Sequence, residues 1–416
     1  MGQITVKGNV APGLESLRQL FERRMNELWE DNAQLCVYVG DEKVVDLTAS
    51  TSDRFSADSI INVFSSGKNF ESIAMATLVS RGLLDYNARV ADYWPEFSQQ
   101  GKHELTIAEL MRHEAGLAAF NISINPSDLV TERIKQNSIG RIIEEHPQKY
   151  QKGEDKREYH AISRGWIINE VFRRIEPTGR TISEFLRVDL SPKLDADVIV
   201  GIKESDRSRI TPLRPLGIKR QILESLKPRF MNRGVNDNFL QLSGKMLRMA
   251  PSASKSTTIG TPPPFAGFRM DIGLFNDPAI AMGETSSANA HCSARGLARV
   301  AAMMAQRGKL DGQTFLTEEA WTALHAEPMT SNMGLKTIFT QGGVALFHLP
   351  PDAGVLDKGL NRGREGFYGW MGFGGSLFQW HPEKKIGFAF VPTSLHTTDF
   401  MNERGKAFQA ELLKLI

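Results

Sequence analysis

The chain has 416 residues, of which 41% are hydrophobic and 24% are charged. This is the composition of a globular protein that is long enough to bury a large core. A net charge of +2 gives no overall attraction to nucleic acid. Only two cysteines occur, Cys36 and Cys292, so neither a disulfide framework nor a structural zinc site is expected.

The first ten residues carry no apolar signal segment. No run in the chain approaches the roughly 20 apolar residues of a membrane-spanning helix. We therefore expect a cytoplasmic protein without a transmembrane segment.

The N-terminal region predicts one helix and one hairpin. Apolar residues recur at helical spacing over residues 12–31, which is typical of an amphipathic helix. Two β-rich runs follow at 34–38 and 43–47, and Gly40 and Asp41 between them are typical of a hairpin turn.

The segment 64–68, Phe-Ser-Ser-Gly-Lys, stands before a run of small and apolar residues that predicts a buried helix over 66–81. Ser65 and Lys68 are three residues apart, so at a helix start their side chains point the same way. A partly desolvated lysine has a lowered pKa and can accept the proton of a serine hydroxyl. The free backbone N–H groups at a helix start also favour negative charge there.

The same Ser-x-x-Lys pattern occurs again at Ser252 and Lys255. This second copy lies in the stretch 251–264, which is rich in Ser, Thr and Pro and predicts a long surface loop. No helix is expected to present it, so the pattern alone does not identify a catalytic serine.

The middle of the chain is expected to be mainly helical, with patterns at 106–116, 127–145 and 161–175. Thr106 and Glu109 form a capping-box signature at the first of these. Between residues 203 and 255 there are twelve Lys or Arg against four Asp or Glu. An excess of positive charge of this kind can attract an anionic ligand or a membrane surface. From the sequence alone, we favour the other interpretation, a solvated helical insertion without an anionic partner.

The C-terminal part predicts a helix at 293–307, strands at 344–348, 375–380 and 386–391, and a final helix at 399–415. We expect an α/β (α+β) fold with an antiparallel sheet that is built from both termini and flanked by helices. The prediction is one domain, 1–416, with a sheet subdomain (1–85 and 280–416). The helical subdomain (86–279) is inserted and contains the basic insertion 203–255.

Several blocks of the sequence, taken with Ser65 and Lys68, resemble the serine β-lactamase and penicillin-binding-protein-like superfamily, and more narrowly the class C-like carboxylesterases. The blocks appear in the order expected for that superfamily and together extend through nearly the whole chain. They are LVSRGLLDYNARVADYWPEF (78–97), LTIAELMRHEAGL (105–117), YHAISRGWIINEVFRRI (159–175), ANAHCSARGLARVAAMMAQRG (288–308) and FYGWMGFGGSLFQWHP (367–382).

The resemblance implies a β-lactamase/transpeptidase-like fold and assigns roles to individual residues. Ser65 would be the acyl-accepting nucleophile and Lys68 the group that activates it. Tyr159 matches the tyrosine of the second family motif, which moves a proton to the leaving group; the alternative for Tyr159 is an aromatic residue at a helix start. Ala161 replaces the asparagine of that motif, which argues against penicillin as the natural substrate.

The third family motif normally begins with Lys or His, and here the triplet is Trp370, Met371 and Gly372. Trp370 resembles the esterase branch and removes a cation that would bind a carboxylate; the alternative is a core residue. Gly372 allows close backbone approach, so the N–H of Phe373 is expected to join that of Ser65 in an oxyanion hole. His160 is expected to contact the ligand or to support the site from behind.

We therefore expect a serine hydrolase, acting on a small-molecule ester or amide and most consistent with a carboxylesterase, that needs no cofactor and no metal. Within the same site, a D-amino-acid peptidase, a transacylase or a weak β-lactamase is an alternative. A non-catalytic scaffold is the alternative from another class, because the second and third motifs are altered.

Overall fold

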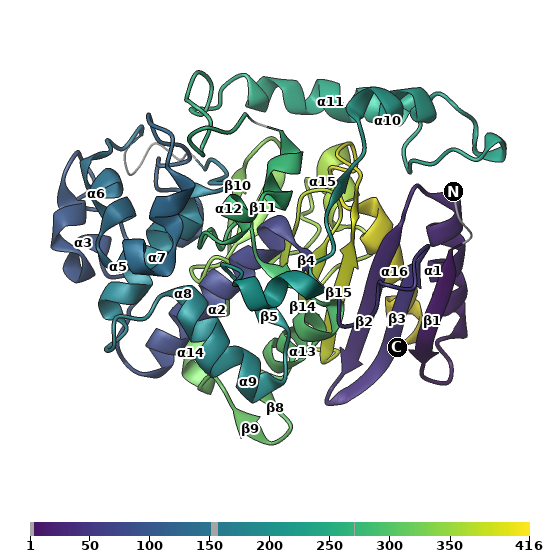
Figure 1. Ribbon diagram of the computed structural model, residues 1–416, viewed down its shortest axis with the longest axis horizontal. Helices are drawn as coiled ribbons and strands as arrows, with labels where there is room; N and C mark the ends of the chain where they lie inside the picture. The colour runs from purple at the N-terminus through teal and green to yellow at the C-terminus, as the bar shows by residue number, and fades with distance from the viewer. Residues whose placement is uncertain (1–3, 151–156, 270) are drawn as a thin grey trace.

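The computed structural model describes residues 4–150, 157–269 and 271–416, and its centre is a nine-stranded antiparallel sheet (Figure 1). The strand order is β1-β3-β2-β15-β14-β13-β12-β11-β10. The strands are β1 (Thr5–Val10), β2 (Asn32–Val39), β3 (Glu42–Ser50), β10 (Met329–Asn332), β11 (Lys336–Phe339), β12 (Ala345–Leu346), β13 (Tyr368–Met371), β14 (Leu377–His381) and β15 (Ile386–Pro392).

The two ends of the chain meet in the middle of this sheet. β15 pairs with β2, and Phe388 lies opposite Val37. The predicted fold class, an antiparallel sheet built from both termini and flanked by helices, is therefore confirmed. The hairpin β2–β3 turns at Gly40, whose φ of 59° suits glycine. Strands β1, β10, β11 and β13 were not expected from the sequence.

Helices cover both faces of the sheet. On one face, α1 (Glu15–Glu27) packs against α16 (Glu403–Leu415), with the rings of Phe21 and Phe408 5.5 Å apart. The other face carries α13 (Ala294–Ala305), which approaches so closely that a Cβ at Gly387 would lie 2.3 Å from the Ala302 nitrogen. The almost completely buried α2 (Lys68–Ser80) belongs to the core cluster of this second face.

The chain between α2 and α13 is mainly helical, and most of it lies to one side of the sheet (Figure 1). Its α-helices are α3 (Val90–Tyr93), α4 (Ile107–Met111), α5 (Thr131–Lys135), α6 (Ser138–Glu145), α7 (Ser163–Ile175), α8 (Ile182–Phe185), α9 (Ser191–Leu194), α10 (Ile218–Ser225), α11 (Phe239–Ala253) and α12 (Pro278–Ala281). Further along the chain are α14 (Glu318–His325) and α15 (Val355–Asn361).

Short strands attach this middle region to the rest of the molecule. β4 (Ile61–Asn62), β7 (His291–Cys292) and β5 (Val198–Ile199) form a small sheet. β6 (Arg214–Pro215) pairs in parallel with β16 (Ser394–Leu395), and this pairing anchors the start of the α10–α11 segment beside the C-terminal strands. A two-stranded hairpin is formed by β8 (Lys309–Leu310) and β9 (Gln313–Thr314).

Several predicted boundaries were wrong, and two of them concern the motifs named from the sequence. The helix that begins after the Thr106 capping box ends at Met111 and not at Gly116, because His113 adopts a left-handed φ of 68°. α11 continues through Pro251 to Ala253, so the predicted surface loop begins at Ser254. The second Ser-x-x-Lys pattern therefore starts in the last turn of a helix. No helix formed by the described residues has the length and apolar character needed to cross a membrane.

Candidate active site

Ser65 lies at the sharp turn between β4 and α2, in a short 3-10 helix (Phe64–Gly67). Phe64 immediately before it has a φ of 46°, a conformation that non-glycine residues rarely adopt. The Asn62 side chain accepts a hydrogen bond from the Phe64 N–H at 2.7 Å and helps to hold this turn. Such local strain is concentrated at functional sites, and here it directly precedes the half-buried Ser65.

The Lys68 amine lies beside the Ser65 hydroxyl. Its Nζ lies 3.3 Å from Ser65 Oγ, 2.7 Å from the carbonyl oxygen of Ala161 and 3.1 Å from that of Ser287. Burial lowers the pKa of Lys68 to about 7, and the nearby Arg164 guanidinium acts in the same direction, while Glu71 opposes both.

A neutral amine has two N–H donors and one lone pair. The carbonyl oxygens of Ala161 and Ser287 can only accept, so they take both N–H bonds of neutral Lys68. The lone pair is then left for the third neighbour, the Ser65 hydroxyl. The contacts therefore leave the lone pair of neutral Lys68 facing Ser65 Oγ.

A buried ion pair stands behind Lys68. Arg164 Nε donates to Glu71 at 2.7 Å, and neither side chain is exposed to solvent. The same carboxylate accepts hydrogen bonds from Ser286 and Ser287, and Arg164 also donates to the carbonyl oxygen of Lys68 at 3.0 Å. This network joins α2, α7 and the segment before β7, and it was not foreseen from the sequence.

Replacing Arg164 with methionine is expected to lower the free energy of unfolding by about 3–5 kcal/mol, because it leaves the Glu71 carboxylate buried and unpaired. Urea denaturation measures this loss. Arg133→Met is the matched control, since Arg133 pairs with Asp128 at the surface, where such pairs contribute only about 0–1 kcal/mol. Equal losses for the two variants would contradict a special contribution from the buried pair.

Tyr159 lies between Lys68 and Trp370. Its ring centroid is 4.8 Å from Lys68 Nζ, and its hydroxyl accepts a hydrogen bond from Trp370 Nε1 at 2.7 Å. Burial raises the pKa of Tyr159 to about 12, although hydrogen bonds with Ser65 and Trp370 oppose the increase. The phenol is therefore neutral at pH 7, and Lys68 is the stronger candidate for the resting base.

Trp370→Phe is expected to lower kcat about tenfold with little change in KM, because one hydrogen bond to the Tyr159 hydroxyl is lost. The aromatic contact with Phe339, at 5.1 Å, can persist. Steady-state kinetics measure the change. Trp380→Phe removes another buried indole hydrogen bond, to His325, away from the site. A similar fall in kcat for this control would argue against a specific role of Trp370.

The glycine-rich turn after β13 lies directly against the Ser65 turn. A Cβ at Gly372 would be 2.0 Å from Ser376 Oγ and 2.2 Å from the Val63 carbonyl oxygen, so no side chain fits there. Ser376 Oγ donates to that same carbonyl oxygen at 2.7 Å. The next residue, Phe373, lies outside regular structure, and among the described residues no acceptor takes its amide hydrogen.

The side chains of Asn402 and Arg404 also hold the glycine-rich turn. Asn402 donates to the carbonyl oxygens of Gly372 and Ser376 at 3.1 and 3.0 Å. Arg404 donates to the carbonyl oxygen of Gly374 and forms a buried ion pair with Glu30. The amide of Phe373 is thus presented on a backbone that is fixed before any ligand arrives.

A cavity of about 180 Å³ opens beside Ser65 and is mainly apolar. Its apolar side chains are Met249, Trp370, Met371, Phe373 and Phe400, and Tyr159, Thr397, Asp399 and Asn402 also line it. Met249 comes from α11, so the basic insertion contributes to the wall of the site. Neither Met249 nor Phe400 is marked by a local pattern in the sequence.

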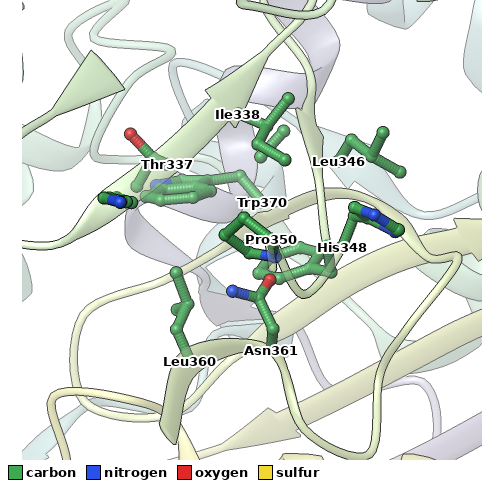
Figure 2. Close-up of a pocket in the computed structure, with 11 residues that line it drawn as sticks. Thr337, Ile338, Leu346, His348, Pro350, Leu360, Asn361 and Trp370 are labelled. Atoms are coloured by element: carbon green, nitrogen blue, oxygen red, sulfur yellow. The ribbon is translucent and has the colours of Figure 1, made fainter. Parts of the chain in front are cut away.

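Trp370 also lines a second, small cavity of about 10 Å³, to which Ser65 does not contribute (Figure 2). Thr337, Ile338, Leu346 and Leu360 are among the residues around it. Its volume is close to the minimum for a single water molecule. Of these two cavities, the one beside Ser65 is therefore the one large enough for a substrate.

His160 is buried behind the site and does not line the cavity. Its Nε2 accepts the N–H of Leu117 at 3.1 Å, and its Nδ1 lies 2.6 Å from the carbonyl oxygen of Glu158. Burial lowers the pKa of His160 to about 4, so the ring is neutral. Of the two roles expected for His160, the structure favours support of the Tyr159 backbone over contact with a ligand.

The described residues contain no group of three or more His, Cys, Asp or Glu side chains that is arranged to hold a metal ion. His291 and Cys292 are both buried in β7. The chemical groups around Ser65 are instead an amine, a phenol and backbone amides.

Comparison with known proteins identifies the family of the chain. Residues 17–411 match the protein family described as Beta-lactamase. Esterase/beta-lactamase LipL of Mycobacterium tuberculosis (strain ATCC 25618 / H37Rv) is 29% identical over 377 residues, which cover 87% of this chain and 76% of that protein.

Two solved structures have similar folds. A penicillin-binding protein homologue from Caulobacter crescentus has a TM-score of 0.76 at 22% identity, covering 99% of this chain and 100% of the other. A family VIII carboxylesterase has the same TM-score at 21% identity and the same coverage.

The fold and these relationships define a serine hydrolase. The chain belongs to the Beta-lactamase family. The resemblance stated from the sequence is thereby confirmed for the family and the fold.

Proposed function

We propose that the protein is a carboxylesterase-like hydrolase that works through an acyl-enzyme on Ser65. The observation that carries this proposal is the set of contacts around Lys68, which leave its lone pair facing Ser65 Oγ at 3.3 Å. With a pKa of about 7, a substantial fraction of Lys68 is neutral at physiological pH and can act as the base.

In the first step, Ser65 Oγ attacks the ester carbonyl carbon while its proton moves to Lys68 Nζ. The oxyanion that forms accepts hydrogen bonds from the amides of Ser65 and Phe373. When the C–O bond breaks, the departing alkoxide takes a proton from the Tyr159 hydroxyl, which regains one from the Lys68 ammonium. Water then attacks the acyl carbonyl carbon, and its proton passes through Tyr159 to Lys68. Lys68 returns a proton to Ser65 Oγ as the bond between Ser65 and the acyl group breaks, and the acid is released.

The lining of the cavity supports an uncharged, apolar ester as the substrate. Five of its side chains are apolar, and no lysine or arginine is among the described residues that line it. Trp370 occupies the place where a cation would bind a substrate carboxylate. Ala161 is exposed and its side chain is only a methyl group. It therefore cannot supply the side-chain amide that the asparagine of the second family motif would present to a substrate.

Hydrolysis of a β-lactam ring is a second candidate activity, because LipL is named an esterase/beta-lactamase. The same acyl-enzyme would serve both reactions. The cavity lining favours the ester, since common β-lactams carry a carboxylate that would lack a cationic partner here.

Turnover of a p-nitrophenyl ester, a chromogenic cephalosporin and a D-amino-acid amide by the same preparation tests the substrate class. We expect kcat/KM for the ester to exceed that for the cephalosporin by at least about 100-fold, roughly what an unpaired buried charge would cost. Labelling by a fluorophosphonate probe, mapped by peptide mass, is expected at Ser65. Turnover of the amide alone would refute the esterase proposal.

A further inference from the structure

The exposed apolar side chains of this protein are concentrated on one short segment. Nine of the eighteen large apolar side chains exposed on the described chain lie between residues 218 and 247. This segment comprises α10, α11 and their connection, and it runs along one edge of the molecule, outside the layers around the sheet (Figure 1). The six most exposed are Leu223, Leu226, Phe230, Met231, Leu240 and Leu247. We call the exposed side of residues 218–255 the α10–α11 surface.

α11 is apolar on the side that faces water. Leu240 and Leu247 are seven residues apart, so they lie on one face, and they are 81% and 75% exposed. The opposite face carries Leu242, which is buried, and Met249, which lines the Ser65 cavity. An ordinary amphipathic helix at a protein surface exposes polar side chains on the face that is in water.

The same segment is strongly basic. Between residues 218 and 255 there are eight Lys or Arg and two acids, Glu224 and Asp237. Both acids are paired with lysines of the segment, Lys227 and Lys245. Within the described chain, the charges of Lys219, Arg229, Arg248 and Lys255 have no ion-pair partner, so an uncompensated positive charge remains on the α10–α11 surface.

Apolar and basic side chains also meet in one hollow. A depression of about 670 Å³ between α10 and α11 is lined by Leu226, Phe239 and Leu240 together with Lys227, Arg229 and Arg233. Apolar side chains with lysine and arginine beside them are the combination that interfacial helices use to bind anionic lipid.

We infer that the α10–α11 surface docks onto an anionic phospholipid surface. The positive charge of the α10–α11 surface favours an anionic lipid surface over a second copy of the chain. A two-fold contact through this surface would bring the unpaired cations of both copies together, and they would repel each other. Docking would also place the Ser65 cavity next to the lipid, since Met249 projects into that cavity from the same helix. The inference does not depend on the proposed chemistry of Ser65.

The test is co-sedimentation of the full-length protein with vesicles of phosphatidylcholine, either alone or mixed with phosphatidylglycerol. We expect at least about tenfold tighter binding to the mixed vesicles, and a loss of that preference at about 1 M salt, where charges are screened beyond ~3 Å. The double variant Leu240→Gln, Leu247→Gln and the double variant Arg229→Gln, Arg248→Gln should each lose most of the binding.

Matched controls make the same chemical changes away from the α10–α11 surface. Val188→Gln with Leu415→Gln removes exposed apolar side chains, and Lys309→Gln removes an exposed charge on β8. These controls should bind like the wild type, and Ser65→Ala should bind unchanged. Equal binding to both kinds of vesicle, or equal losses in controls and test variants, would overturn the inference. A dimer in solution that Leu240→Gln, Leu247→Gln converts to a monomer, without vesicle binding, would also overturn it.

Discussion

Replacing Ser65 with alanine is expected to lower kcat for ester hydrolysis by at least about 10⁴-fold, because no acyl-enzyme can form. The amides of Ser65 and Phe373 and the apolar cavity remain, so a small residual activity over water should persist. The variant should fold normally, since Lys68 keeps its two carbonyl acceptors. Steady-state kinetics and intact-protein mass after fluorophosphonate treatment measure both effects.

Ser254→Ala is the matched control for this substitution. Ser254 is an exposed serine just after α11, and its hydroxyl donates to the carbonyl oxygen of Pro251. We expect wild-type turnover and full labelling from this variant. A probe adduct that survives Ser65→Ala would assign the reactive hydroxyl to another residue and refute the proposed mechanism.

Lys68→Met is expected to lower kcat/KM by about 10²–10⁴-fold, the range of a general base. In the wild type, kcat/KM should rise about tenfold per pH unit below pH 7 and level off above it, because only the neutral amine accepts the proton and the pKa of Lys68 is about 7. The variant should lack this rise. Lys255→Met, at the exposed lysine of the second Ser-x-x-Lys pattern, should retain the wild-type profile.

The same lowered pKa has a consequence for stability that does not involve turnover. Between pH 7 and about 10.5, the unfolded chain holds a proton on Lys68 that the folded protein has released. The free energy of unfolding of the wild type should therefore rise by about 1.4 kcal/mol per pH unit, relative to Lys68→Met, over this interval. Urea denaturation of both proteins at pH 7, 8 and 9 measures the difference. A constant difference would mean that the folded protein keeps Lys68 charged.

The parts of the site that could be predicted are those that depend on local chain geometry. Ser65 and Lys68 are three residues apart, so a helix start suffices to bring them together. Gly372 was identified from the third family motif, and in the structure a Cβ at this position would have no space. The family resemblance added Tyr159 and Trp370, whose hydrogen bond joins positions 211 residues apart.

Other features depend on tertiary contacts that leave no periodic pattern in the sequence. Met249 lines the cavity from α11, and the start of the α10–α11 segment is anchored by the pairing of β6 with β16. Neither two-residue strand is visible in the sequence. His160 is adjacent to Tyr159, but its side chain is directed into the backbone network around Leu117. The Glu71–Arg164 pair joins two helices, and each residue alone is typical of a solvated helix face.

The pairing of β2 with β15 also affects how the chain folds during its synthesis. Ser376 donates a hydrogen bond to the carbonyl oxygen of Val63, which lies 313 residues earlier in the chain. The two halves of the site are therefore synthesised far apart in time. At about 5–20 residues per second, the ribosome needs roughly 15–60 s to cover that distance. Until β15 is synthesised, the edge of β2 that pairs with it has no partner strand, and such edges promote aggregation. The nascent chain is thus most vulnerable before β15 emerges, a period in which chaperone binding would protect it most.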